Sequence, residues 1–177
     1  MEKLKWQLKS FAQLSPKQLF SLYHLRTAVF VVEQTCAYQE VDEHDLVSHH
    51  LLGFSQQSLV ACARICPPQS VYPQASIGRV AIADGHRGKG QGRLLFKEAL
   101  AQCHILYPQQ ELKIQAQVYL EKFYQSFGFK TISEPYPDFG IMHVDMVLAI
   151  INWIKNCQRK NKLIKGKKAA KVQAVKL

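Results

Sequence analysis

The sequence lacks an uninterrupted apolar run that could span a bilayer, and its first residues lack the apolar core of a secretion signal. It also lacks a Cys-x-x-Cys pair, because its five cysteines are dispersed: Cys36, Cys62, Cys66, Cys103 and Cys157. An odd number of dispersed cysteines without a secretion signal favours reduced thiols. We therefore expect a soluble, cytoplasmic protein with no membrane contact, in which Cys62 and Cys66 are small core residues.

Charge of one sign is absent from two long segments. Residues 27–63 contain no Lys or Arg but five acidic residues, whereas residues 155–177 contain nine Lys or Arg and no acidic residue. Residues 1–154 hold 14 basic against 13 acidic residues, so the net charge of +10 comes almost entirely from the end of the chain. We therefore divide the sequence into a nearly neutral domain, 1–154, and a basic tail, 155–177, which we expect to be flexible.

The length of 177 residues and the hydrophobic content of 47% suit one globular domain with a sizeable core. The tail contains no aromatic side chain on which a nucleobase could stack. We therefore do not expect nucleic-acid binding as the main function, although the charge of the tail leaves an electrostatic contact with a polyanion open.

Hydrophobic periodicity and turn residues predict an α/β domain with the element order β-α-β-β-β-α-β-α-β-β. Ser15 and Pro16 start the first helix, and Gly128 stops the last one. The expected strands are 5–9, 50–54, 59–66, 77–83, 112–118, 129–132 and 143–150. The expected helices are 16–29, 91–107 and 120–127.

A glycine-rich basic loop joins the strand 77–83 to the helix 91–107. It contains Arg87, Gly88, Lys89, Gly90, Gln91, Gly92 and Arg93. Glycines at alternate positions allow a sharp turn and a close approach of the backbone to a ligand. The free N–H groups and the dipole at the start of the following helix favour an anion, and the basic side chains add positive charge. The loop is therefore predicted to bind a pyrophosphate.

The spacing of the loop decides which pyrophosphate ligand it suits. Lys89 is followed by Gly90 and not by Ser or Thr, which excludes a Walker loop. A dinucleotide fingerprint that starts at Gly88 would need glycine at position 93, which is Arg93. The remaining pattern, Arg87-x-x-Gly90-x-Gly92, resembles the acetyl-CoA signature of the GNAT N-acetyltransferases.

A second segment carries a further resemblance to the same family. Residues 117–129 look like its second signature, a helix that ends in Tyr124-x-x-x-Gly128-Phe129. The amino-acid sequence of residues 25–42 and 77–80 is similar to that of the ElaA-type members of this family. The resemblance covers about residues 5–150 and does not extend into the tail.

The resemblance implies a GNAT-type α/β (α+β) fold, in which a mixed, twisted sheet has helices on both faces. It also implies an enzyme that moves the acetyl group of acetyl-CoA to a primary amine by direct attack in a ternary complex, without a metal. The acceptor is either a small-molecule amine or a peptide amine, and the sequence does not decide between them. The oligomeric state is likewise left open between a monomer and a homodimer. Two alternatives are a non-catalytic acyl-CoA-binding module and a protein acetyltransferase that its basic tail tethers to polyanions.

The resemblance also implies where the cosubstrate binds. The strand 78–82 is expected to splay from the strand 113–118, so that pantetheine lies in the gap. Backbone N–H groups of three consecutive residues would polarise the acetyl carbonyl: Val80, Ala81 and Ile82. Gln117 stands where many members carry an asparagine that bonds pantetheine, so the reach of this amide departs from the family pattern.

Tyr124 is the candidate general acid, because a phenol has a pKa near 10, close to that of a thiol leaving group. Tyr124 is also expected to contact the cofactor. Glu33 and His143 are the first candidates for the general base. Further candidates are Asp42, Asp45 and Asp145.

Two other patterns leave alternatives. The acidic residues of 27–63 would attract a cationic amine, or they pair with Arg26, Arg64 and Arg79 and shape the pocket. The histidines at 44, 49 and 50 match no metal-ligand spacing, so we do not expect a metal.

Overall fold

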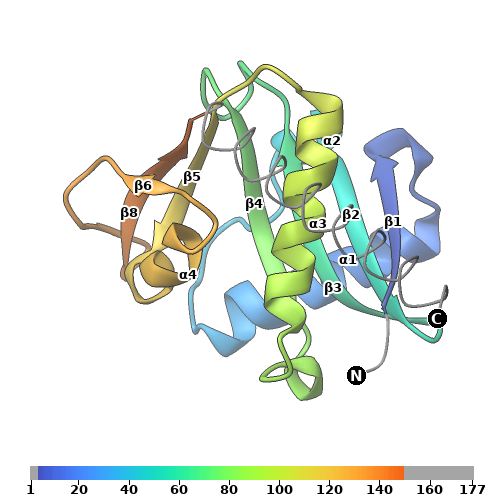
Figure 1. Ribbon diagram of the computed structural model, residues 1–177. Coiled ribbons are helices and arrows are strands. Elements are labelled where there is room, and N and C mark those ends of the chain that lie inside the picture. Colours follow the sequence, from blue (N-terminus) through green and yellow to red (C-terminus); the bar gives the residue numbers. More distant parts are fainter. Residues whose placement is uncertain (1–3, 150–177) are drawn as a thin grey trace, which may run out of the picture.

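The computed structural model of this protein describes residues 4–149. In this part of the chain one sheet of eight strands has the order β1-β2-β3-β4-β5-β8-β6, with β7 paired to β8 (Figure 1). The strands are β1 (Lys5–Ser10), β2 (His49–Ser55), β3 (Ser58–Cys66), β4 (Ala75–Ile82), β5 (Leu112–Gln117), β6 (Lys130–Thr131), β7 (Tyr136–Asp138) and β8 (Ile141–Leu148). The pair β4–β5 is parallel and the other pairs are antiparallel, so the prediction of a mixed sheet is confirmed.

Helices cover both faces of this sheet. Figure 1 shows α3 crossing one face in front of β3 and β4, with α1 behind them. The helices are α1 (Pro16–Thr27), α2 (His44–Val47), α3 (Gln91–Leu106) and α4 (Glu121–Gln125). A π-helical segment, Ala28–Glu33, continues α1, and short 3-10 turns occupy Phe11–Gln13, Asp84–His86 and Val118–Leu120. The predicted arrangement with helices on both faces is therefore confirmed.

Alternation along the strands divides the core into two layers. On one face, Ala63 and Ile65 of β3 join Leu95, Phe96 and Ala99 of α3 in a large buried cluster. On the opposite face, a second cluster joins Leu52 of β2 and Cys62 of β3 to Leu22 and Leu25 of α1 and Val29 of the π-helical segment. Successive strand residues point to opposite faces, so a single strand supplies both layers. Cys62 and Cys66 are buried free thiols, as predicted for core residues.

The ends of the helices follow the local chemistry of the sequence. The Ser15 hydroxyl accepts the N–H of Gln18 at 3.2 Å, and the Gln18 side chain accepts the N–H of Ser15 at 3.1 Å. This reciprocal pair and Pro16 start α1 as predicted. At the end of the α4 region, Gly128 has φ +99°, a conformation that favours glycine and ends the helical turn.

Three details of the expected element order were wrong or incomplete. Helix α2 was not predicted, because four residues are too short to show a helical period. Strand β7 was missed because Pro135 and Pro137 favour a loop, yet Pro137 is tolerated in a short edge strand. The last strand begins at Ile141 and not at His143, because its first residues pair with β7. The tail 155–177 and the last residues of the predicted domain lie outside the described residues.

Candidate active site

A cleft opens where β4 and β5 separate. The two strands pair only at Ala75–Leu112 and Ser76–Lys113. Farther along, a β-bulge bends β4 away, because Arg79 and Val80 together lie opposite one residue of β3. Arg79 has φ +50° at this bulge. The predicted splay is therefore confirmed, and it leaves an open cavity of about 440 Å³ between the strands.

Beyond Ser76, the edge of β4 that faces this cleft does not pair with β5. The N–H of Ala83 donates to the carbonyl of Val60 in β3 at 2.8 Å. Backbone groups alternate between the two edges of a strand, so Val80 and Ile82 face the cleft and Ala81 faces β3. The N–H of Ala81 therefore points toward β3, whereas those of Val80 and Ile82 point toward the cleft, where the expectation places a ligand.

Tyr124, Gln117 and His143 line the same cleft. The Tyr124 side chain is 8% exposed, and its ring lies against Phe96, with 4.9 Å between the ring centroids. Burial, with a smaller contribution from the phenol of Tyr119, raises the pKa of Tyr124 to about 12. Tyr124 therefore keeps its proton at neutral pH, but it is a weaker acid than an ordinary phenol, and its pKa is less closely matched to that of a thiol than was expected from the sequence.

His143 and Gln117 lie directly opposite each other on β8 and β5. The His143 Nδ1 atom is 2.8 Å from the carbonyl oxygen of Ile141, which leaves the other ring nitrogen for a ligand. The Gln117 amide donates to the Gln34 side chain at 3.3 Å and accepts the Tyr119 hydroxyl at 2.6 Å. These bonds fix the amide that replaces the asparagine of the family pattern.

Glu33 does not line this cleft. Its carboxylate, at the end of the π-helical segment, accepts two hydrogen bonds from Arg87, at 2.6 and 2.7 Å. The hydrogen bond from Arg87 holds the pKa of Glu33 below its usual range. An ion-paired carboxylate with a lowered pKa is a weak base. Of the two first candidates for the general base, only His143 lines the cleft, so His143 is better placed to accept a proton from a ligand there.

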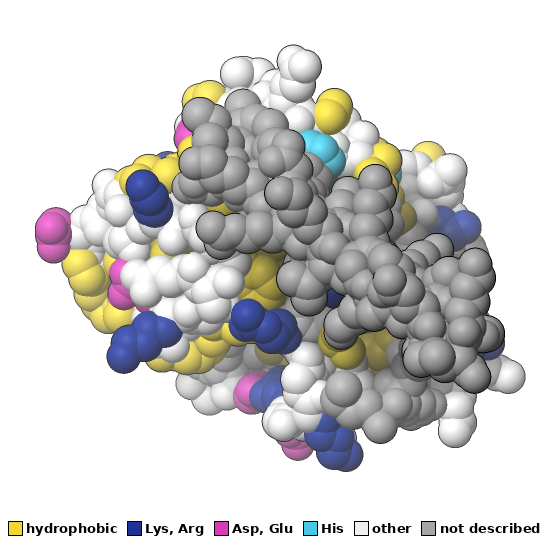
Figure 2. Space-filling model, viewed as in Figure 1, with side chains coloured by type: hydrophobic (Ala, Val, Ile, Leu, Met, Phe, Trp, Pro, Cys, Tyr) yellow, Lys and Arg dark blue, Asp and Glu magenta, His cyan; other side chains and the backbone are white. Residues whose placement is uncertain are grey.

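The glycine loop lies between the end of β4 and the start of α3. Gly88 and Gly90 both have φ +73°, which favours glycine. Arg87 also donates through Nε to the carbonyl oxygen of Ile82 at 2.9 Å. Arg93 donates to the Ser126 hydroxyl at 2.8 Å, so it connects this loop to the segment after α4. Figure 2 shows basic side chains, with a few acidic ones, around the lower end of the molecule near this loop.

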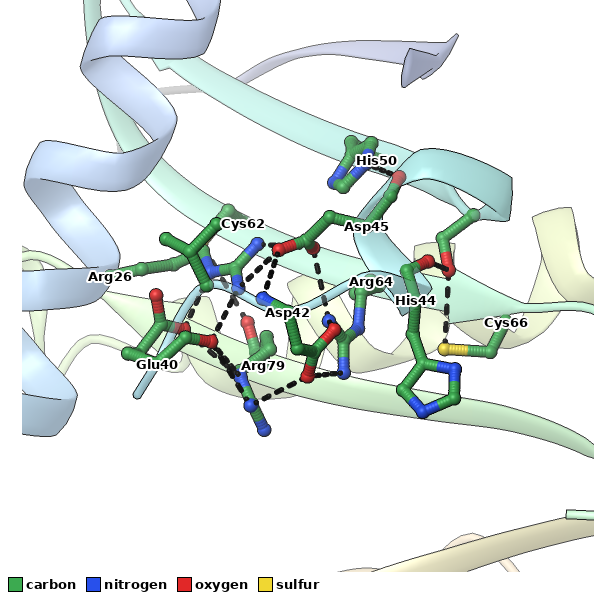
Figure 3. A network of polar contacts seen from close by, with 12 residues as sticks. Arg26, Glu40, Asp42, His44, Asp45, His50, Cys62, Arg64, Cys66 and Arg79 are labelled. Carbon is green, nitrogen blue, oxygen red and sulfur yellow. Dashed lines mark hydrogen bonds and ion pairs between the residues drawn. The ribbon is translucent and has the colours of Figure 1, made fainter. Parts of the chain in front are cut away.

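A buried ion-pair network lies beside the bulge of β4, and Asp42, Arg64 and Arg79 of this network line the cleft (Figure 3). Arg26 of α1 binds Glu40 and Asp45, both at 2.7 Å. Arg64 of β3 binds Asp45 at 3.0 Å and also binds Asp42. Burial alone would raise the pKa of Asp45, but Arg26 and Arg64 outweigh it and lower that pKa.

Arg79 completes this network. It lies 2.9 Å from Glu40 and 3.2 Å from Asp42. Three arginines therefore neutralise three of the five acidic residues in 27–63, and Arg87 pairs with a fourth, Glu33. The expectation of a negative field from this stretch is wrong, and the alternative, that Arg26, Arg64 and Arg79 pair with these acids, is confirmed.

Sequence reasoning missed several residues of the cleft. They are Tyr38, Tyr72, Asp138 and Phe139. Tyr72, Asp138 and Phe139 lie in a loop, in the short strand β7 and in the turn after it, where no periodicity or motif marks them. Tyr38 lies in the segment 25–42, whose similarity to the ElaA-type members assigned it no role. Only their tertiary contacts show that they surround the cleft.

Within residues 4–149, no three His, Cys, Asp or Glu side chains gather as a metal site. The same part of the chain contains no helix that is long and apolar enough to cross a membrane.

The sequence and the fold were compared with known proteins. A family model described as an acetyltransferase (GNAT) domain matches residues 12–150. Protein ElaA of Escherichia coli strain K12 is 39% identical over 150 residues, which cover 84% of this chain and 98% of that protein. The crystal structure of Escherichia coli ElaA has a TM-score of 0.77 and covers 81% of this chain and 98% of its own.

Two further structures show the same fold. An acyl-CoA N-acyltransferase from Pseudomonas aeruginosa has a TM-score of 0.80 and 39% identity, and the match covers 83% of this chain and 100% of that one. A GNAT family acetyltransferase from Elizabethkingia anophelis, solved with acetyl-CoA bound, has a TM-score of 0.58 and 16% identity, with 83% and 96% of the two chains covered. At that identity the match shows the fold alone.

Proposed function

Since the chain belongs to the GNAT acetyltransferase family and is an acyltransferase, we propose that it moves the acetyl group of acetyl-CoA to a primary amine. The amine attacks directly in a ternary complex. The observation that carries this proposal is the cleft between the splayed strands β4 and β5, which Tyr124 and His143 both line. We further propose a cytoplasmic location, which the free thiols of the four described cysteines support.

The residues of the glycine loop fit the cosubstrate. A Cβ atom added at Gly88, Gly90 or Gly92 would meet no atom within 4 Å, so the space above the loop is open to a ligand. The first N–H groups of α3 have no acceptor within the helix and favour an anion. We propose that this loop, 87–93, holds the pyrophosphate. When bound, acetyl-CoA supplies an activated acetyl thioester.

The side chains of the cleft then divide the proton transfers between them. The N–H groups of Val80 and Ile82 stabilise negative charge on the acetyl oxygen. His143 accepts a proton from the attacking amine as the N–C bond forms. Tyr124 donates its phenol proton to the departing sulfur as the C–S bond breaks, so the products are the amide and the free thiol. Exchange with water restores both side chains.

A thiol-release assay with acetyl-CoA and a panel of primary amines tests this function. We expect thiol release that depends on the amine, with the acetylated product identified by mass spectrometry. A protein that binds acetyl-CoA but releases no thiol with any amine would instead be the acyl-CoA-binding module considered above.

We expect Gly92→Val to abolish measurable acetyl-CoA binding without unfolding the protein. Gly92 lies in the first turn of α3 with an ordinary helical backbone and open space around it, so the free protein accommodates a side chain there. That side chain would occupy the place of the pyrophosphate. Calorimetry measures the loss, and Gly90 is a poorer site for the test because its φ of +73° strains any other residue. Unchanged binding would show that the ligand lies elsewhere.

We expect Glu33→Gln to tighten acetyl-CoA binding by about two- to fivefold and to leave kcat unchanged. The variant removes a negative charge that competes with the pyrophosphate for Arg87, and the exposed position keeps the effect small. Calorimetry and kcat against pH measure the two quantities, with the exposed Glu43→Gln as the control. A kcat that falls and recovers at high pH would return the role of general base to Glu33.

A further inference from the structure

The cleft contains carboxylates in two different electrostatic situations. Asp42 is paired with Arg64 and Arg79, so its charge is compensated. Asp138 also lines the cleft, but no Lys, Arg or His of residues 4–149 forms an ion pair with it. The negative charge of Asp138 is therefore available to a ligand.

Asp138 has a defined position. It ends β7, opposite Ile141 of β8, and its Oδ2 atom accepts a hydrogen bond from the Gln115 amide at 3.0 Å. Gln115 and Gln117 both line the cleft and are two residues apart on β5, so they lie on one face about 7 Å from each other. Asp138 lies opposite Ile141, two residues along β8 from His143, so its backbone is about 7 Å along the strand from the level of Gln117 and His143, where the reaction is proposed to occur.

The space beside Asp138 has aromatic walls. Phe139 follows Asp138 directly, and its ring packs on Tyr38 with 5.0 Å between the ring centroids. The carbonyl oxygen of Phe139 accepts a hydrogen bond from the Cys36 thiol at 3.3 Å, which holds the turn against the opposite loop. Tyr72 lines the same cavity. A flexible hydrocarbon chain suits such walls, and a cation at its end suits the carboxylate.

We propose that Asp138 binds a second cationic group of the acceptor. The substrate class is then an amine that carries another ammonium group about 7 Å from the reacting nitrogen, such as an α,ω-diamine. This inference rests on the proposed acetyl transfer, and it adds a residue that determines specificity and takes no part in the proton transfers. The aromatic walls hold the methylene chain between the two charged ends.

The test compares 1,4-diaminobutane with butylamine, which differ by one ammonium group. We expect the wild type to have at least tenfold higher kcat/KM for the diamine, and Asp138→Asn to remove most of this preference while butylamine is unaffected. Asp138→Glu, which keeps the charge, should retain part of the preference. Glu134→Gln, an exposed acid in the preceding loop, is the matched control and should behave as the wild type.

Calorimetry of 1,4-diaminobutane binding provides a readout that needs no turnover. We expect the diamine to bind the wild type at least tenfold more tightly than it binds Asp138→Asn, and added salt should reduce the difference. Equal binding by the two proteins, or equal kcat/KM of the wild type for the diamine and butylamine, would overturn the inference. Tighter diamine binding without any thiol release would contradict the proposed function and leave the Asp138 site standing.

Discussion

Tyr124→Phe is expected to lower kcat by about 10²–10⁴-fold, the usual effect of a lost general acid, and to leave acetyl-CoA affinity unchanged. The ring is buried among Phe96, Phe123 and Phe129, so the variant keeps the packing and loses only the hydroxyl. Steady-state kinetics measures kcat, and calorimetry measures the affinity. Because both quantities come from one folded variant, a packing defect would be recognised by a change in affinity.

The pH dependence gives an independent check of this assignment. Burial raises the pKa of Tyr124 to about 12, so the phenol stays protonated well above neutral pH. We therefore expect no loss of wild-type kcat from deprotonation of this group between pH 7 and 10. Tyr107→Phe is the matched control, because it removes a phenol hydroxyl from a partly buried tyrosine that does not line the cleft. Full activity of Tyr124→Phe would mean that another group protonates the thiolate.

Arg26→Met is expected to lower the free energy of unfolding by about 3–5 kcal/mol, because it removes one of the two cations that pair with each of the buried carboxylates Glu40 and Asp45. Arg26 is 0% exposed, and it donates hydrogen bonds to Glu40 and Asp45. Chemical denaturation measures the change. A loss this large would exceed most single substitutions and would identify the network as a main support of the cleft.

Lys17→Met is the control for this experiment, because it removes the same charge from the exposed side of the same helix and should cost about 0.5 kcal/mol or less. The pKa of Asp45 is lowered in the folded state, so its pairing stabilises the protein above the usual pKa of an aspartate. This contribution is lost as the pH falls through the lowered value. An Arg26→Met variant as stable as the wild type would show that the network contributes only to the shape of the cleft.

Much of the fold could be predicted, because its signals are local. Ser15, Pro16 and Gly128 mark helix ends by the bonds and backbone angles that they favour, and the structure has them in those roles. Residues 91–106 form a helix close to the predicted bounds, with Leu95, Ala99 and Cys103 on its buried side. The short strand β7 and helix α2 could not be predicted, because three or four residues carry no period.

The position of the cleft was also predictable, but only through the family resemblance. Two spaced signatures implied that the strands β4 and β5 would splay, and the pairing of only two residue pairs confirms it. The partners of the polar side chains were not predictable in the same way. Asp138 has no sequence signal, because its significance depends on Gln115, 23 residues earlier, and on cations that lie elsewhere.

The sequence by itself determined the glycine loop before α3, the position of Tyr124 ahead of Gly128 and the order of the main elements. These depend on neighbouring residues, whose conformations and spacing are set by the local chain. Only the tertiary structure decided which charges meet. Glu33 and Arg87 are 54 positions apart, and Arg79 and Asp42 are 37 apart, yet each pair is in contact. The physical reason is that an ion pair requires two side chains at one point in space, and here the packing of α1 and the loop after it against β3 and β4 creates that point.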